Sequence, residues 1–313
     1  MGRSKKGDIV NGWIALDKPV GLTSTQAVGK VRRHLNAQKI GHGGTLDPLA
    51  SGILPIALGE ATKTIPYIQD HLKTYIFTVQ WGEQRSTDDM EGEIIATSPN
   101  RPGKAAIEAI LPRFTGEIMQ VPPQFSAIKV DGERAYDIAR DGGAVELKPR
   151  MVYIEELELL EHGPDRAVFR AYCGKGTYIR SLARDMALAL GTVGFIAALR
   201  REDVGPLGPE NAISLDSLLN LPHSAALETA LLPVETVLDG IPALTINQQE
   251  AARLKNGQML SFISRQDSER LDKAGVIQDG QNPATALAVY NGKPVALVIV
   301  EGIDIQPVRV LNL

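Results

Sequence analysis

Hydrophobic residues recur with two different spacings in the first two thirds of the chain. We expect a strand where a short apolar or alternating run lies between turn residues, and a helix where apolar residues recur every three or four positions. The predicted strands are residues 12–16, 75–81, 93–96, 152–160 and 167–173, with 93–96 pairing with 75–81 and the last two forming an antiparallel pair. The predicted helices are residues 24–35, capped by Ser24 or Thr25, 104–111 and 179–190.

The pattern changes near Pro242. Residues 206–232 are rich in Leu and Pro and predict helical connections, and a further helix is expected around residues 248–254. Four short strands are then predicted at residues 260–263, 286–290, 294–300 and 308–311, with a hairpin turn at Asn291-Gly292. We therefore predict an α+β domain over residues 1–241, with a mixed, largely antiparallel sheet and flanking helices. Residues 242–313 are predicted to form a small β-rich domain.

Asp47 lies in the segment Gly41-His42-Gly43-Gly44-Thr45-Leu46-Asp47-Pro48. Glycines permit positive φ and the close approach of a large ligand, and a following proline biases Asp47 toward an extended conformation. Such a loop is suited to presenting one carboxylate to a substrate. A loop aspartate beside a proline is also common as a turn or helix-cap residue, so the segment alone leaves both interpretations open.

Composition argues against a disulfide-bonded, zinc-binding, exported or membrane-spanning protein. The chain of 313 residues has one cysteine, Cys173, which excludes an intrachain disulfide, and its five histidines have no paired spacing that would indicate zinc. The N-terminus has no apolar core of signal-peptide length. The longest uncharged run, residues 186–199, is too short to span a membrane and is interpreted as a buried helix, its end and the following turn. We expect no metal, no export and no membrane partner.

Charge is unevenly distributed along the chain. The net charge is −4, but residues 1–47 carry 8 basic and 3 acidic side chains, and residues 173–201 carry 5 and 1. Residues 211–313 carry 7 basic and 11 acidic side chains and account for the excess of acid. The two basic segments are consistent with a groove for phosphates, although solvated helix faces explain the counts equally well.

Familiar cofactor and nucleophile motifs are missing from the sequence. It contains no GxxxxGK[ST] for nucleotide phosphates and no GxSxG for a serine nucleophile, and the glycines at 41 and 43 lack the third member of a dinucleotide fingerprint. Cys173 is a poor candidate for a thiol nucleophile, because it lies in a moderately apolar strand and such surroundings disfavour the reactive thiolate. Carboxylate chemistry assisted by Tyr and Arg remains, with no cofactor.

Several segments together resemble one family, the TruB-type tRNA pseudouridine synthases, which are related to the dyskerin enzymes. The matching segments occur in the order of that family, from residue 13 to about 206. They are Asp17-Lys18-Pro19-x-Gly21-x-Thr23-Ser24, the Asp47 segment, Gly59-x-Ala61-Thr62-Lys63, Tyr75, residues 82–92 with Asp88-Asp89, residues 122–132, Gly176-Thr177-Tyr178-Ile179-Arg180-Ser181-Leu182 and Leu199-Arg200-Arg201. Residues 242–313 resemble a PUA-type RNA-binding module less closely.

The resemblance implies isomerisation of uridine 55 in the T-stem loop of tRNA to pseudouridine. The base is detached from C1′ at N1, turned, and rejoined at C5, which needs neither cofactor nor metal. The target base must leave the loop, so the enzyme needs a pocket with stacking surfaces. The resemblance implies a monomeric cytoplasmic enzyme with an additional role in tRNA folding. It leaves open whether the PUA-like domain contacts the acceptor stem.

The resemblance also assigns roles to individual residues. Asp47 matches the catalytic aspartate, which either adds covalently to the sugar or abstracts its 2′-proton, and Arg180 matches the arginine that pairs with it. Tyr75 matches the tyrosine that stacks on the base and helps to deprotonate C5. The substrate-binding matches are Tyr178 and Leu199 in the pocket, His42 as a wedge in place of the flipped base, Asp89 as a hydrogen-bond partner of the base or loop, and Lys18, Lys63 and Lys129 in contact with RNA or closing the site.

Two departures from the family pattern affect only the surroundings of the site. The family commonly has Ser where Gly174 stands and Tyr where Phe125 stands. Two rival functions remain open. One is a non-catalytic RNA-binding protein that helps tRNA to fold, and the other is a synthase that modifies rRNA.

Overall fold

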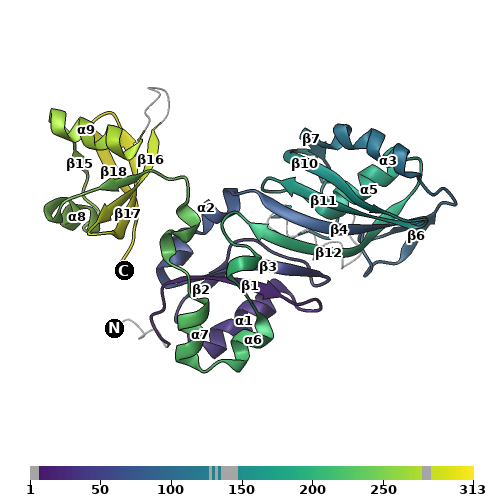
Figure 1. The fold of residues 1–313 in the computed structure, drawn as a ribbon, viewed down its shortest axis with the longest axis horizontal. Coiled ribbons are helices and arrows are strands. Elements are labelled where there is room, and N and C mark those ends of the chain that lie inside the picture. Colours follow the sequence, from purple (N-terminus) through teal and green to yellow (C-terminus); the bar gives the residue numbers. More distant parts are fainter. Residues whose placement is uncertain (1–6, 127–128, 131–132, 135–146, 277–282) are drawn as a thin grey trace.

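The chain folds into a large sheet covered by helices and a smaller curled sheet at the C-terminal end (Figure 1). The computed structural model describes residues 7–126, 129–130, 133–134, 147–276 and 283–313. No helix in these ranges is long and apolar enough to cross a membrane.

The large sheet is mixed, as predicted. Its strands follow the order β13-β1-β3-β12-β4-β11-β10-β7, and β2 pairs with β3. Among these pairs only β1 with β13 and β3 with β12 are parallel. The strands are β1 (Gly12–Lys18), β2 (Ile40–His42), β3 (Ala50–Leu58), β4 (Lys73–Trp81), β7 (Gly116–Gln120), β10 (Arg150–His162), β11 (Arg166–Cys173), β12 (Gly194–Val204) and β13 (Ala212–Ser214).

Helices cover this sheet at both ends. One group lies under β1 and β3, and another covers the end formed by β7, β10 and β11 (Figure 1). The first group is α1 (Ser24–His34), α6 (Leu215–Asn220) and α7 (His223–Ala230), and the second is α3 (Lys104–Ile110) and α5 (Ile179–Ala189). Helix α1 begins after Thr23, whose side chain accepts a hydrogen bond from Gln26 N in a capping box. The cap is therefore Thr23, rather than the predicted Ser24 or Thr25.

Two strand predictions need correction. Residues 94–97 form β6 (Ile94–Thr97), which pairs with β5 (Glu83–Arg85) and not with β4. The segment after Gly191, interpreted as a turn, becomes the central strand β12. The first six residues of β12 are apolar without alternation, so periodicity does not distinguish them from the end of a buried helix.

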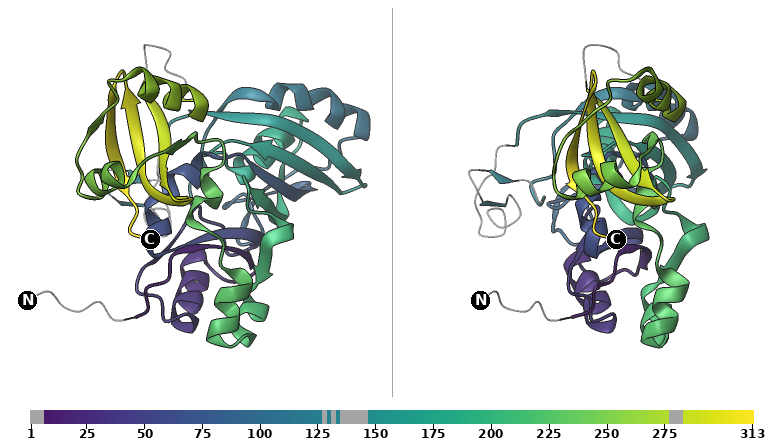
Figure 2. Two further views of the ribbon diagram at one scale, coloured as in Figure 1. Left: turned by 60° about the vertical axis from the view of Figure 1, so that its left-hand side comes forward. Right: turned by 90° about the vertical axis from the view of Figure 1, so that its left-hand side faces the viewer.

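The C-terminal part is a curled five-stranded sheet (Figure 2) with the order β14-β16-β17-β18-β15. The strands are β14 (Ala243–Thr245), β15 (Leu260–Ser261), β16 (Ala284–Tyr290), β17 (Lys293–Glu301) and β18 (Asp304–Val310), with helices α8 (Gln248–Lys255) and α9 (Arg265–Ala274). The predicted turn between β16 and β17 is confirmed, with φ of 50° at Asn291 and 75° at Gly292. Helix α9 was not predicted.

The two parts share a hydrophobic cluster. Leu287, Leu297 and Leu311 from the C-terminal sheet pack with Trp13 and Ile53 of the large sheet. Polar contacts border this cluster at the 3-10 helix η1 (Gly59–Lys63). There Lys63 Nζ donates to Val310 O at 2.7 Å, and Asn312 N donates to the Glu60 carboxylate at 2.8 Å. The C-terminal sheet is thus docked on the strand that follows the Asp47 loop.

Candidate active site

The Asp47 loop connects β2 to β3 and is fastened to the start of α1. Leu46 N donates to Ser24 Oγ at 2.8 Å, and the same hydroxyl donates to Leu46 O at 3.0 Å. On the other side of Asp47, Gly21 N donates to Pro48 O at 2.7 Å. Both neighbours of Asp47 are therefore held by backbone bonds, while its own side chain keeps 35% of its surface exposed.

Arg201 supports the loop from below. Its side chain is buried, and it donates from Nε to Ile53 O at 2.7 Å and from Nη2 to Gly44 O at 3.1 Å. Strand β3 passes very close to it, because a Cβ on Gly52, where φ is +102°, would lie 2.0 Å from Arg201 O. Within the described part of the chain, no carboxylate lies within ion-pair distance of Arg201. Its cationic charge is therefore satisfied by these two carbonyls and by the Tyr75 hydroxyl.

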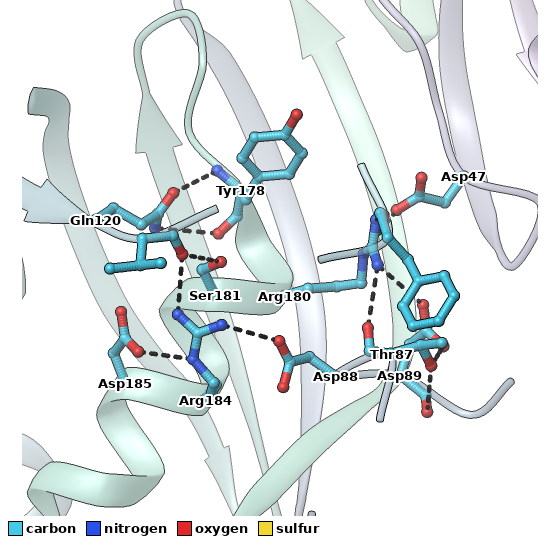
Figure 3. Close-up of polar contacts among 12 residues, drawn as sticks. Asp47, Thr87, Asp88, Asp89, Gln120, Tyr178, Arg180, Ser181, Arg184 and Asp185 are labelled. Atoms are coloured by element: carbon cyan, nitrogen blue, oxygen red, sulfur yellow. Dashed lines mark hydrogen bonds and ion pairs between the residues drawn. The ribbon is translucent and has the colours of Figure 1, made fainter. Parts of the chain in front are cut away.

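Arg180 reaches Asp47 from the first turn of α5 (Figure 3). Its Nε lies 2.9 Å from Asp47 Oδ2, and its side chain is only 5% exposed. Two carbonyls fix the guanidinium: Nη1 donates to Thr87 O at 3.0 Å, and Nη2 donates to Phe125 O at 2.9 Å. The backbone of Phe125 makes this contact, so replacing the usual tyrosine there leaves it intact. A positive charge at a helix N-terminus opposes the helix dipole, and these partners compensate for that position.

Asp89 lies on the far side of Arg180 from Asp47. Its Oδ2 is 3.6 Å from Arg180 Nη1 and its side chain is 4% exposed. Its other oxygen accepts hydrogen bonds from Thr87 Oγ1 and, at 3.0 Å, from Glu91 N. The structure therefore brings three predicted residues, Asp47, Arg180 and Asp89, into one charged cluster.

Tyr75 and Leu199 lie on neighbouring strands beside the Asp47 loop. Tyr75 of β4 pairs with Arg201 of β12, and Leu199, two residues earlier on β12, pairs with Ala50 at the end of the Asp47 loop. Burial raises the pKa of the Tyr75 hydroxyl, and the nearby Arg201 charge only partly offsets it. The phenol is therefore protonated in the free protein.

Tyr178 is held at the N-terminal end of α5. Its N donates to Gln120 Oε1 at 2.8 Å, and its O accepts from Gln120 Nε2 at 3.1 Å, as Figure 3 shows. The guanidinium carbon of Arg150 lies 4.8 Å from the centre of the Tyr178 ring. Gln120 and Arg150 were not predicted, because neither residue has a distinctive sequence context.

His42 is the last residue of β2, and it is partly buried. Burial, followed by the positive charge of Arg201, lowers the pKa of His42, against a smaller opposing effect of the Gly44 backbone. The ring is therefore neutral at pH 7. A neutral planar ring suits stacking on a base better than pairing with a phosphate.

Two of the predicted lysines make hydrogen bonds within the protein. Lys18 is fully buried, and its Nζ donates to Pro19 O at 2.9 Å and to Leu22 O at 2.8 Å. Burial lowers the pKa of Lys18 to about 8, although the Asp47 charge opposes this change. In the free protein Lys18 supports the chain behind the loop and Lys63 binds β18, and the predicted contact of both lysines with RNA stays a prediction. Lys129 lies in the short strand β8 (Lys129–Val130), and its side chain is outside the described residues.

Family models match most of the chain. The TruB family pseudouridylate synthase N-terminal domain matches residues 32–179, and the tRNA pseudouridylate synthase B C-terminal domain matches residues 180–239. Curated relatives named tRNA pseudouridine synthase B are 53% identical in Rhodospirillum rubrum and 51% identical in Caulobacter vibrioides, each covering 100% of both chains. The chain belongs to the TruB family of pseudouridine synthases.

This TruB-family enzyme also resembles a more distant solved structure. A chain in the crystal structure of a Cbf5-Nop10-Gar1 complex has 26% identity and a TM-score of 0.72, covering 96% of this chain and 85% of that one. The large mixed sheet of the TruB-family enzyme is thus the pseudouridine synthase fold. Among the residues described, no three His, Cys, Asp or Glu side chains gather closely enough to hold a metal ion.

Sequence reasoning missed one central residue of this TruB-family site. Arg201 appeared only as part of the Leu199-Arg200-Arg201 match, with no role of its own. A signal was available, because Arg201 closely follows the apolar run of residues 194–199, and an arginine at a buried strand position usually has specific partners. That signal becomes clear only once the run is recognised as a central strand.

Proposed function

We propose that this enzyme isomerises uridine 55 in the T-stem loop of tRNA to pseudouridine, with Asp47 as the catalytic carboxylate. One observation carries the proposal: an aspartate on a rigid loop is paired at 2.9 Å with a buried arginine, beside two tyrosines. The names of the relatives that match the whole chain support tRNA as the substrate.

The chemistry needs only groups of the chain and the substrate. The C1′–N1 bond breaks, its electron pair leaves with the uracil, and a C1′–C5 bond forms after the base has turned. The C5 proton is then lost and N1 gains one, which restores the aromatic uracil with no net change in composition. Asp47 assists either by adding to C1′ and leaving again as the C1′–C5 bond forms, or by abstracting the 2′-proton to give a glycal-like intermediate and returning it to C2′. Arg180 orients the carboxylate in both versions.

In this proposal Tyr75 first meets the flipped base as a neutral aromatic ring. Its raised pKa keeps the hydroxyl protonated, so the ring stacks without a charge. To accept the C5 proton, Tyr75 must first lose its own proton. The neighbouring Arg201 favours that step, because its charge lowers the pKa of the phenol against the effect of burial.

The remaining substrate contacts are assigned by position. Tyr178 and Leu199 would line the pocket, Asp89 would hydrogen-bond the flipped base or the loop, and the neutral His42 ring would occupy the place that the base leaves. We further propose that residues 242–313 form a PUA-like module that contacts the acceptor stem. The hydrogen bonds between this module and η1 support the proposed contact, because they fix the module relative to the Asp47 loop. We expect a cytoplasmic monomer with an additional tRNA-folding role.

The Asp47→Asn variant tests the proposed function. Asparagine keeps the size of the side chain and removes the charge, so we expect unchanged tRNA binding and no detectable pseudouridine. Single-turnover release of tritium from tRNA labelled at uridine C5 measures the reaction, and filter binding measures affinity. Asp17→Asn is the matched control, since Asp17 pairs with Arg200 at 2.9 Å away from this cluster.

Two results would contradict the proposal. Tritium release by Asp47→Asn at the wild-type rate would remove Asp47 from the mechanism. Carbodiimide-dependent primer extension on total RNA locates the product, and a stop only in rRNA would favour the rRNA-directed alternative. If the wild-type protein binds tRNA and releases no tritium, the non-catalytic folding protein is the better description.

A further inference from the structure

Two adjacent acidic residues beside the site point in opposite directions (Figure 3). Asp89 faces Arg180, whereas Asp88 forms an ion pair with Arg184 at 3.0 Å between Oδ2 and Nη1. Arg180 and Arg184 are four residues apart in α5, so they lie on one face of the helix, a turn apart. Each member of the acidic pair therefore meets one member of the basic pair.

The backbone at Asp88 is what makes the two side chains diverge. Asp88 has φ of +59°, in the left-handed region that residues other than glycine rarely adopt. Backbone bonds hold it there: Asp88 N donates to Arg85 O, and Ile196 N donates to Asp88 O, both at 3.0 Å. A conformation this unusual is maintained when the surroundings require it.

Arg184 joins this loop to a second segment around the site. Besides Asp88, its Nη2 donates to Val121 O at 2.9 Å, and Ser181 Oγ donates to the same carbonyl at 2.8 Å. Its Nε contacts Asp185 Oδ1 at 2.9 Å. Residues 87–89 and 121–125 are the two segments whose carbonyls fix Arg180. Arg184 thus binds both segments one helical turn behind Arg180.

We propose that the Asp88–Arg184 ion pair positions Arg180 against Asp47 by holding the two segments that surround the Arg180 guanidinium. The pair itself touches neither Asp47 nor the pocket tyrosines, so it is a positioning pair and not a catalytic one. The inference rests on the role of Asp47 and Arg180 in the proposed isomerisation. A small displacement of a reacting group lowers a rate far more than it lowers affinity.

The titration of Asp88 adds a second consequence. Burial raises the pKa of the Asp88 carboxyl to about 6, against the opposing charges of Arg184 and Arg180. Asp185 of α5 and Asp89 of the same loop are the acidic groups near it, and β12 contributes the Ile196 backbone. Protonation below pH 6 therefore removes the negative charge of Asp88 from the Asp88–Arg184 ion pair. The rate of isomerisation should fall there, with tRNA binding retained.

Substitutions at Asp88 separate its carboxylate from its backbone. Asn and Gly both tolerate positive φ, so Asp88→Asn and Asp88→Gly remove the charge without forcing the loop to change. We expect single-turnover rates to fall roughly tenfold in both variants and in Arg184→Gln, with tRNA affinity within about twofold of wild type. The control Asp165→Asn removes a 2.8 Å pair with Arg101 far from the site and should react normally.

The pH profile between 5 and 8 supplies a readout that a merely structural role would not change. The wild-type rate should decline on the acid side near pH 6, and Asp88→Asn should lack that decline. Wild-type rates and profiles in Asp88→Asn and Asp88→Gly would overturn the inference, even if Arg184→Gln failed to fold. An active Asp47→Asn would instead overturn the proposed function, so the two failures are distinguishable.

Discussion

At the residue scale, the Asp47 loop depends on one buried cation, Arg201, that has no acidic partner among the residues the structure describes. Arg201 supports Gly44 through its carbonyl, interacts with the Tyr75 hydroxyl, and contributes to the lowered pKa values of His42 and Lys18. Its planar guanidinium reaches Ile53 O and Gly44 O together. A lysine offers a single ammonium group and cannot reproduce that fork.

The Arg201→Lys variant should therefore retain the charge and lose the geometry. We expect a fall in the single-turnover rate of about tenfold or more, because the Asp47 loop loses one of its supports. Unfolding in urea should show a loss of about 1–3 kcal/mol, since at least one buried carbonyl remains unsatisfied. Arg200→Lys, at the exposed neighbour, is the control, and equal effects at both positions would count against this role.

Local motifs indicated which side chains of the candidate site lie together. Asp47 and Arg180 come together at 2.9 Å, and the helix over residues 179–190 begins where its pattern predicts. The burial of Lys18 and Arg201 could not be predicted in this way. A charged side chain satisfied by backbone carbonyls depends on strands that meet only in the folded protein.

At the element scale, the site depends on the parallel pairing of β3 with β12. These two strands carry Gly52 and Arg201 in direct register. The sequence did not predict this pair, because β3 and the first six residues of β12 are apolar without alternation, and β12 begins only a few residues after the end of α5. The antiparallel pair β10 and β11 was predicted correctly, since its partners are consecutive and joined by a short turn.

Gly52→Ala should disturb this pairing directly. An added methyl group would lie 2.0 Å from Arg201 O, and φ at this position is +102°. The strands must separate or the loop must shift, so we expect a loss of stability of about 1–3 kcal/mol together with reduced activity. Thermal unfolding and tritium release measure the two effects. Gly240→Ala, where φ is also positive and nothing lies nearby, controls for strain alone; an equal loss there would refute the steric explanation.

At the scale of the whole molecule, the two sheets share one hydrophobic cluster. Leu297 is fully buried in β17, yet it packs with Trp13 of β1 rather than with the core of its own sheet. The change of pattern near residue 242 indicated a separate β-rich unit. It gave no sign of this shared core, because an apolar strand residue does not reveal which partner will cover it.

Leu297→Ala should destabilise the large sheet as well as the small one. Removing a buried leucine costs about 2–5 kcal/mol, and part of that cost falls on the neighbours of Trp13. Urea unfolding followed by tryptophan fluorescence reports on the large sheet, since both tryptophans, Trp13 and Trp81, lie in it. Ile263→Ala, at an exposed position, should leave the transition unchanged. An unaltered midpoint in Leu297→Ala would show that the sheets unfold independently.

The buried Arg201 beneath the Asp47 loop also affects the proposed reaction electrostatically. No carboxylate of the described residues pairs with it, so its charge leaves a positive potential beside Tyr75. In the proposed reaction uracil arrives neutral and becomes negatively charged only when it takes the electron pair of the C1′–N1 bond. Arg201 should therefore stabilise the detached base more than the bound substrate, so its charge should favour the bond-breaking step rather than binding.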